Sequence, residues 1–140
     1  MYYDYELTVY PDDTKDKPAE MLCPLVYGIL RDVSITFPAG VHRVTKITVW
    51  HFERQLHPTN PEMSFSSNDF TIGWQEYYPI IEVPYLLKVR GWNEGGSYPH
   101  TIRCRFNILN PNVVNLGVSS PVSREELEDI LGEYESAGVL

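Results

Sequence analysis

Period-two alternation of apolar and polar residues recurs through the first 110 residues, where Pro, Gly and charged clusters interrupt it at short intervals. Near the end of this region, Ile102, Cys104 and Phe106 alternate with Arg103 and Arg105. Such alternation is typical of half-buried strands. No helical pattern separates these segments, so the crossover helices that parallel strands need are missing. The sequence therefore predicts a mainly β domain of roughly seven or eight antiparallel strands, a sandwich or jelly roll.

The segment after Asn110 breaks this pattern and predicts an extended arm followed by a short amphipathic helix. Ser123 fits the N-cap of that helix, and Glu126 completes a capping box. Its apolar stripe consists of Leu127, Ile130, Leu131 and Tyr134. A helix of about twelve residues must dock on something to be stable, and both its own sandwich and a neighbouring subunit qualify. We expect a sandwich domain over 1–110 and an arm and helix over 111–140.

Composition narrows the classes of partner. The formal net charge of −8 disfavours direct contact with nucleic acid and with anionic membranes. The chain starts Met1-Tyr2-Tyr3-Asp4, without the basic and apolar regions of a signal peptide, and its apolar runs are too short to span a membrane. These features predict a soluble protein made in the cytoplasm. Its two cysteines, Cys23 and Cys104, are expected to be buried and unpaired.

A glycine-rich segment spans Gly91 to Gly96, with the sequence Gly-Trp-Asn-Glu-Gly-Gly. It lacks the Lys-Ser/Thr ending and the following helix of a phosphate-binding loop. The segment instead predicts a tight turn that closes a hairpin onto the strand at 101–109.

His51, Glu53 and His57 form the strongest candidate metal site. On a strand His51 and Glu53 point the same way, and two imidazoles with a carboxylate can bind zinc or iron. Jelly-roll oxygenases, however, place a second His two residues after the first, where this chain has Glu53. A further distant ligand such as His100 would also be needed. A metal-dependent jelly-roll enzyme is therefore the third hypothesis, and we assign no catalytic residue, metal or cofactor.

Aromatic side chains beside the predicted turns are better candidates for contacts. Such rings fill a core, stack on sugars or anchor a protein interface. For a protein interface we single out Tyr77, Tyr78, Trp92 and Tyr98, together with the apolar stripe of the C-terminal helix. The alternative is a carbohydrate-binding module that uses Trp74, Tyr77, Tyr78 and Trp92.

Several segments resemble small β proteins encoded among the virion genes of tailed bacteriophages. They are Val26-Tyr27-Gly28-Ile29, Phe37-Pro38-Ala39-Gly40, the stretch from His51 to Pro61, Trp92-Asn93-Glu94 and Pro99-His100-Thr101. The resemblance covers residues 25–109 and implies an auxiliary structural role, such as capsid decoration or stabilisation. Such proteins are often trimers whose terminal arms clamp neighbouring subunits. We therefore expect a non-enzymatic virion protein that forms homo-oligomers and contacts a capsid protein.

Overall fold

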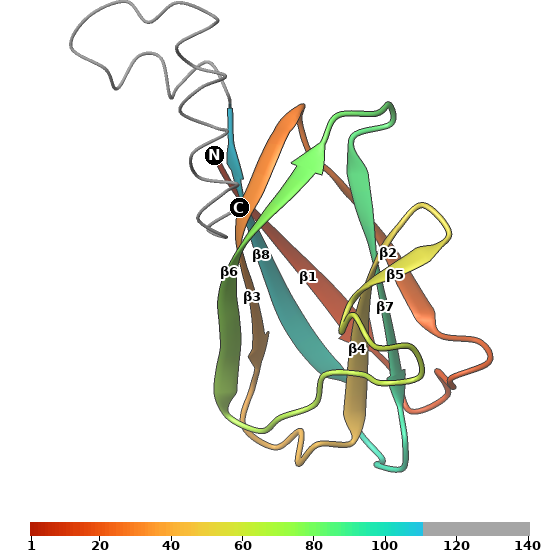
Figure 1. The fold of residues 1–140 in the computed structure, drawn as a ribbon. Coiled ribbons are helices and arrows are strands. Elements are labelled where there is room, and N and C mark those ends of the chain that lie inside the picture. Colours follow the sequence, from red (N-terminus) through yellow and green to blue (C-terminus); the bar gives the residue numbers. More distant parts are fainter. Residues whose placement is uncertain (111–140) are drawn as a thin grey trace, which may run out of the picture.

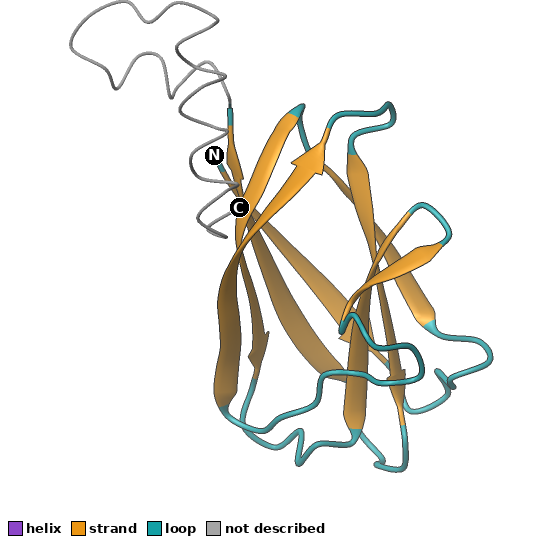
Figure 2. Ribbon diagram, in the orientation of Figure 1, coloured by secondary structure: helices purple, strands orange, loops and turns teal. Residues whose placement is uncertain are grey.

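Two four-stranded antiparallel sheets face each other in the computed structural model, which describes residues 1–110 (Figures 1 and 2). The strands are β1 (Tyr2–Val9), β2 (Ala19–Pro24), β3 (Gly28–Phe37), β4 (Thr45–His51), β5 (Arg54–His57), β6 (Phe70–Ile80), β7 (Leu86–Asn93) and β8 (His100–Leu109). None of the described residues is helical, and the predicted β-sandwich is confirmed. The predicted arm and helix of 111–140 lie outside the described residues.

The strand order is that of a jelly roll. One sheet runs β1-β8-β3-β6 and the other runs β2-β7-β4-β5. The antiparallel pairs β4 with β5, β3 with β6, β2 with β7 and β1 with β8 are nested around the β4–β5 turn. Eight strands wound in this way give a double Greek key, in which loops gather at the two ends of the sandwich.

The core lies between the inner faces of the two sheets, where alternate residues of nearly every strand meet. The largest fully buried side chains include Phe37, Phe106, Leu30 and Ile35 from one sheet and Ile47 from the other. Because period-two alternation directs these residues inward, their neighbours along each strand face outward. The outward residues of the β2-β7-β4-β5 sheet supply most of the candidate functional site.

The glycine-rich turn does not close a hairpin, so that prediction was wrong. Gly95 and Gly96 have positive φ angles of 90° and 85°, as a tight turn requires. However, β7 pairs with β2 and β4, whereas β8 pairs with β1 and β3 in the other sheet. The turn therefore carries the chain from one sheet to the other, because a local turn signal does not determine which strands pair.

Candidate functional site

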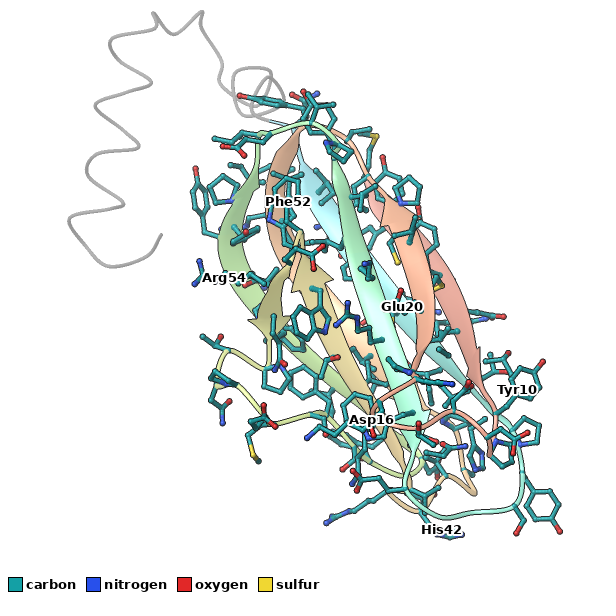
Figure 3. All side chains as sticks on the ribbon, turned by 90° about the vertical axis from the view of Figure 1, so that its right-hand side faces the viewer. Tyr10, Asp16, Glu20, His42, Phe52 and Arg54 are labelled. Atoms are coloured by element: carbon teal, nitrogen blue, oxygen red, sulfur yellow. The ribbon has the colours of Figure 1, made fainter. Side chains whose placement is uncertain are left out.

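A groove crosses the outer face of the β2-β7-β4-β5 sheet, with a volume of about 290 Å³. Its floor consists of Glu20 from β2, Thr48 and Trp50 from β4, Gln55 from β5, and Arg90 and Trp92 from β7. These residues lie on one face because the strands are in register, with Glu20 opposite Arg90 and Trp50 opposite Gln55. Figure 3 faces this sheet and shows Glu20 near its middle.

Two loops form the walls of the groove. Lys15, Asp16 and Pro18 come from the loop between β1 and β2, and Glu62 and Met63 come from the loop between β5 and β6. The loops meet where Lys15 Nζ lies 3.1 Å from Glu62 Oε2. Both side chains are exposed, so this ion pair contributes little to stability.

Arg90 is the most constrained charged side chain of the groove. Its guanidinium carbon lies 4.3 Å from the centre of the Trp50 ring, in a cation–π contact. Its Nε lies 2.9 Å from Glu20 Oε1, an ion-pair distance, yet this buried Nε makes no hydrogen bond. Arg90 is thus held in place between the Trp50 ring and the Glu20 carboxylate.

Gln55 shapes the groove through the loop that follows β5. Its Nε2 donates hydrogen bonds to the backbone oxygens of Pro58, at 2.7 Å, and Met63, at 3.1 Å. The same loop returns to β4 through paired backbone hydrogen bonds between Ile47 and Phe65. These bonds fix Met63 and Glu62 beside the sheet without a regular strand.

A second surface lies at the end of the sandwich from which residue 109 emerges. We call it the end surface and define it by four exposed apolar side chains: Tyr27, Phe52, Ile81 and Val83. They come from the β2–β3, β4–β5 and β6–β7 connections, which lie at one end of a jelly roll. Beside them is a second hollow of about 300 Å³, lined by residues that include His51, Phe52, Tyr78 and Ile81.

Phe52 adopts a backbone conformation that aromatic residues rarely adopt. His51 pairs with Arg54, so Phe52 and Glu53 form a two-residue hairpin turn. Phe52 has a φ of 55°, in the left-handed region that glycine usually occupies in such turns. Its ring packs 4.3 Å from the ring of His51, and 42% of the residue remains exposed.

Two histidines near these surfaces are occupied by partners. A hydrogen bond of 2.5 Å joins His51 Nδ1 and the Tyr78 hydroxyl, and His57 Nε2 lies 2.7 Å from Glu76 Oε1. Burial lowers the pKa of His51, partly offset by the charge of Glu82, and burial also raises the pKa of Tyr78. His51 Nε2 is buried without a hydrogen-bond partner.

The candidate metal ligands are not brought together. His51 pairs with Tyr78 at the end of β4, whereas His57 contacts Glu76 at the far end of β5. Within residues 1–110, no group of three or more His, Cys, Asp or Glu could hold a metal ion. The cysteines are buried and free, and burial raises the pKa of Cys23 to about 12, so it is a poor nucleophile.

The predicted contact residues are spread over different parts of the sandwich. Trp74, Tyr77 and Tyr78 belong to β6 of one sheet, whereas Trp92 belongs to β7 of the other and faces the groove. Tyr98 is 73% exposed in the β7–β8 connection, at the opposite end from the end surface. The structure does not gather these rings into one platform. The interface residues Leu127, Ile130, Leu131 and Tyr134 lie outside the described residues.

Sequence reasoning missed Trp50, Arg90 and Glu20 as members of one site. Trp50 and Arg90 each occupy an outward position of an alternating segment, and that was the available signal. It shows that each residue faces outward, but it does not show that the three strands are neighbours.

Comparisons with known proteins leave the family open. No family model matches the sequence, and no curated protein matches it. Among solved structures, the chain is similar to one described as the crystal structure of Yersinia pseudotuberculosis-derived mitogen (YPM). The two share 9% sequence identity with a TM-score of 0.41, and the match covers 78% of this chain and 86% of that chain. A TM-score this low establishes neither a common fold nor a common function. In the described part of the chain, no helix is long and apolar enough to cross a membrane.

Proposed function

We propose that this protein is a non-enzymatic assembly component, an auxiliary virion protein that binds other copies of itself through the end surface. The observation that carries the proposal is Phe52, an exposed aromatic residue in a strained hairpin turn. A bulky residue held in such a conformation costs about 1–3 kcal/mol, and strained residues of this kind cluster at functional sites. A ring retained there at that cost is explained by a contact outside the sandwich.

The neighbours of Phe52 support an interface. Val83 is 76% exposed and Ile81 is 54% exposed, and Tyr27 packs edge-on against Tyr85 at a centroid distance of 5.9 Å. Clustered apolar side chains at a surface are typical of protein contacts.

We propose that the C-terminal segment of a second copy binds the end surface. Leu109 ends β8 at this end of the sandwich, beside Met1, whose backbone oxygen accepts a hydrogen bond from Ile108 N at 2.8 Å. The twelve residues of 111–122 can span at most about 40 Å, enough to reach a neighbouring subunit. The apolar stripe predicted within 127–134 matches the apolar character of the end surface. Docking in trans would link copies into an oligomer.

The virion assignment rests on the resemblance to auxiliary phage proteins and on the jelly-roll topology, which viral capsid domains often use. The virion assignment is tested by peptide mass spectrometry of particles purified from the organism whose genome encodes this chain. The chain should be present at a fixed ratio to the major capsid protein. Its absence from intact particles would remove the virion role while leaving self-assembly to be judged separately.

Self-assembly is tested by light scattering coupled to size exclusion, using the full chain and three variants. The wild type should be an oligomer, whereas Phe52→Gly and Val83→Asp should shift it to monomer with unchanged circular dichroism. Tyr98→Asp is the matched control, because Tyr98 is as exposed as Val83 but lies at the other end. It should assemble like the wild type.

Deletion of 111–140 separates docking in trans from docking in cis. If the segment docks on a second copy, the truncated chain should be a monomer that melts at the same temperature as the wild-type protein diluted to monomer. A wild type that stays monomeric at high concentration, or a Val83→Asp variant that still assembles, would overturn the proposal.

A further inference from the structure

We propose that the groove on the β2-β7-β4-β5 sheet is a binding site for a small neutral saccharide. The residues that would hold the saccharide are Glu20, Trp50, Gln55, Arg90 and Trp92. This site is separate from the end surface and does not depend on the assembly role proposed above. It also differs from the aromatic platform predicted from the sequence, because only Trp92 belongs to both.

Arg90 and Glu20 together match the hydrogen-bonding character of a sugar diol. Arginine offers only donors and an ionised carboxylate only acceptors, and here the two groups lie 2.9 Å apart. A hydroxyl both donates and accepts, so neighbouring hydroxyls can each engage one of these groups. Both side chains remain partly exposed in the groove, Arg90 at 25% and Glu20 at 45%, so a ligand can reach them.

The two indole rings give the groove a rigid floor rather than an open stacking platform. Arg90 lies 4.3 Å from the centre of the partly exposed Trp50 ring, and Trp92 is only 7% exposed at the edge of the lining. The indole nitrogens are already engaged, with Trp50 Nε1 donating to Thr48 Oγ1 at 2.9 Å and Trp92 Nε1 donating to Glu94 Oε1 at 3.2 Å. These bonds fix both rings before any ligand arrives, which lowers the entropic cost of binding.

The charges that line the groove exclude the main competing ligands. Two cations, Lys15 and Arg90, face three carboxylates, Asp16, Glu20 and Glu62. Each cation already lies near a carboxylate, Lys15 at 3.1 Å from Glu62 and Arg90 at 2.9 Å from Glu20. A phosphate or sulfate would be repelled by the excess of carboxylates, and a metal ion would have to displace Lys15 or Arg90 from the carboxylate that each contacts. A neutral polyol meets neither penalty.

The size of the groove limits the ligand. Its volume of about 290 Å³ is at the lower end of small-molecule sites, and both of its walls are loops. We therefore expect a terminal unit on the order of one or two sugar rings, presented from a longer glycan that leaves the groove between the loops.

The test is a glycan array probed with the full-length chain, containing neutral, sialylated and sulfated oligosaccharides. The strongest neutral binder is then titrated by calorimetry against the wild type and two variants. Arg90→Lys keeps the charge but loses the planar fork of donors, and Glu20→Gln keeps the shape but loses the carboxylate. Each should weaken binding by roughly tenfold or more.

Arg103→Lys is the matched control. Arg103 lies in β8 of the other sheet and contacts Glu6 at 2.6 Å and Asp4 at 3.4 Å, so it is also an arginine paired with carboxylates. The Arg103→Lys variant should bind the glycan with an affinity within about twofold of that of the wild type. Melting temperatures of all three variants show whether any loss of binding reflects unfolding.

Three results would overturn the proposal. They are the absence of any glycan binding at millimolar concentration, unchanged affinity in both groove variants, and binding confined to sulfated or sialylated glycans. Val83→Asp should bind the same glycan as the wild type. That result would separate the groove from the end surface, so failure of one proposal can be recognised without failure of the other.

Discussion

Gly91 shows at the scale of one residue how closely the two sheets approach. A Cβ built at Gly91 would lie 2.7 Å from Val9 Cγ2 and 2.9 Å from Ile47 Cδ1. Gly91→Ala should therefore lower the free energy of unfolding by about 1–3 kcal/mol, because the core cannot make room without moving β1. Urea unfolding followed by tryptophan fluorescence measures the change.

Gly73→Ala is the control for that substitution. A Cβ at Gly73 would meet its nearest atom, Val33 O, at 3.6 Å, an ordinary contact. Its free energy of unfolding should stay within about 0.5 kcal/mol of the wild type. Equal losses at the two positions would show that overpacking at Gly91 is not the cause.

His51 should make stability depend on pH between 5 and 7. Burial lowers the pKa of His51 below its ordinary value of 6.5, so the unfolded chain binds a proton more readily than the folded one. Stability is therefore greatest above pH 6.5 and decreases as the pH falls toward the lower pKa of the folded state. Thermal melts of the wild type and His51→Asn between pH 5 and 7.5 test this.

His51→Asn should show a flatter dependence of melting temperature on pH than the wild type. The exposed His42 provides the control, because its φ of 50° is one that asparagine tolerates. His42→Asn should retain the wild-type slope. A wild-type slope in His51→Asn would assign the pH dependence to other groups.

In the β4–β5 hairpin, the residue that we propose for the interface also lowers the stability of the monomer. Phe52→Gly relieves the positive φ but removes the contact between the ring and His51. We expect a net gain of about 1 kcal/mol, or a rise in melting temperature of about 3 °C, when the protein is monomeric. Differential scanning calorimetry at low concentration measures it.

Asp69→Gly is the comparison for the hairpin. Asp69 also has a positive φ, of 48°, but aspartate adopts this conformation with less strain than phenylalanine. Its melting temperature should rise less than that of Phe52→Gly. If Phe52→Gly is less stable than the wild type even as a monomer, the turn is not strained and the main support for the interface fails.

Long strands could be predicted from the sequence, whereas the shortest strand could not. The long alternating strands, such as β8, have a clear pattern of buried and exposed positions. β5 spans only four residues, Arg54–His57, and is followed by Pro58, so its pattern is too short to be distinguished from a loop. β5 is instead held by its pairing with β4 and by the Gln55 side chain, and both are tertiary contacts.

For the whole molecule, the class of fold was predictable and the pairing of strands was not. Alternation along each strand reports which side of a sheet a residue faces, but the jelly roll pairs β1 with β8 and β2 with β7 across most of the chain. The groove depends on that pairing, since Glu20 and Arg90 are neighbours only because β2 lies beside β7. The sequence pattern singled out Trp92, but it did not identify Glu20, Trp50 and Arg90, which line the same groove.

The pairing of the first strand with the last also determines how the domain would respond to mechanical load. Tyr2 lies opposite Asn107 and Val9 opposite His100, so Met1 and Leu109 meet at one end of the ladder. A tensile force between these two ends would break the hydrogen bonds of this seam one after another, starting at Met1. Peeling of this kind needs much less force than shearing all the bonds at once. Because β1 is the edge strand and β8 is also paired with β3, such a force would peel β1 from the sheet and leave β8 in place.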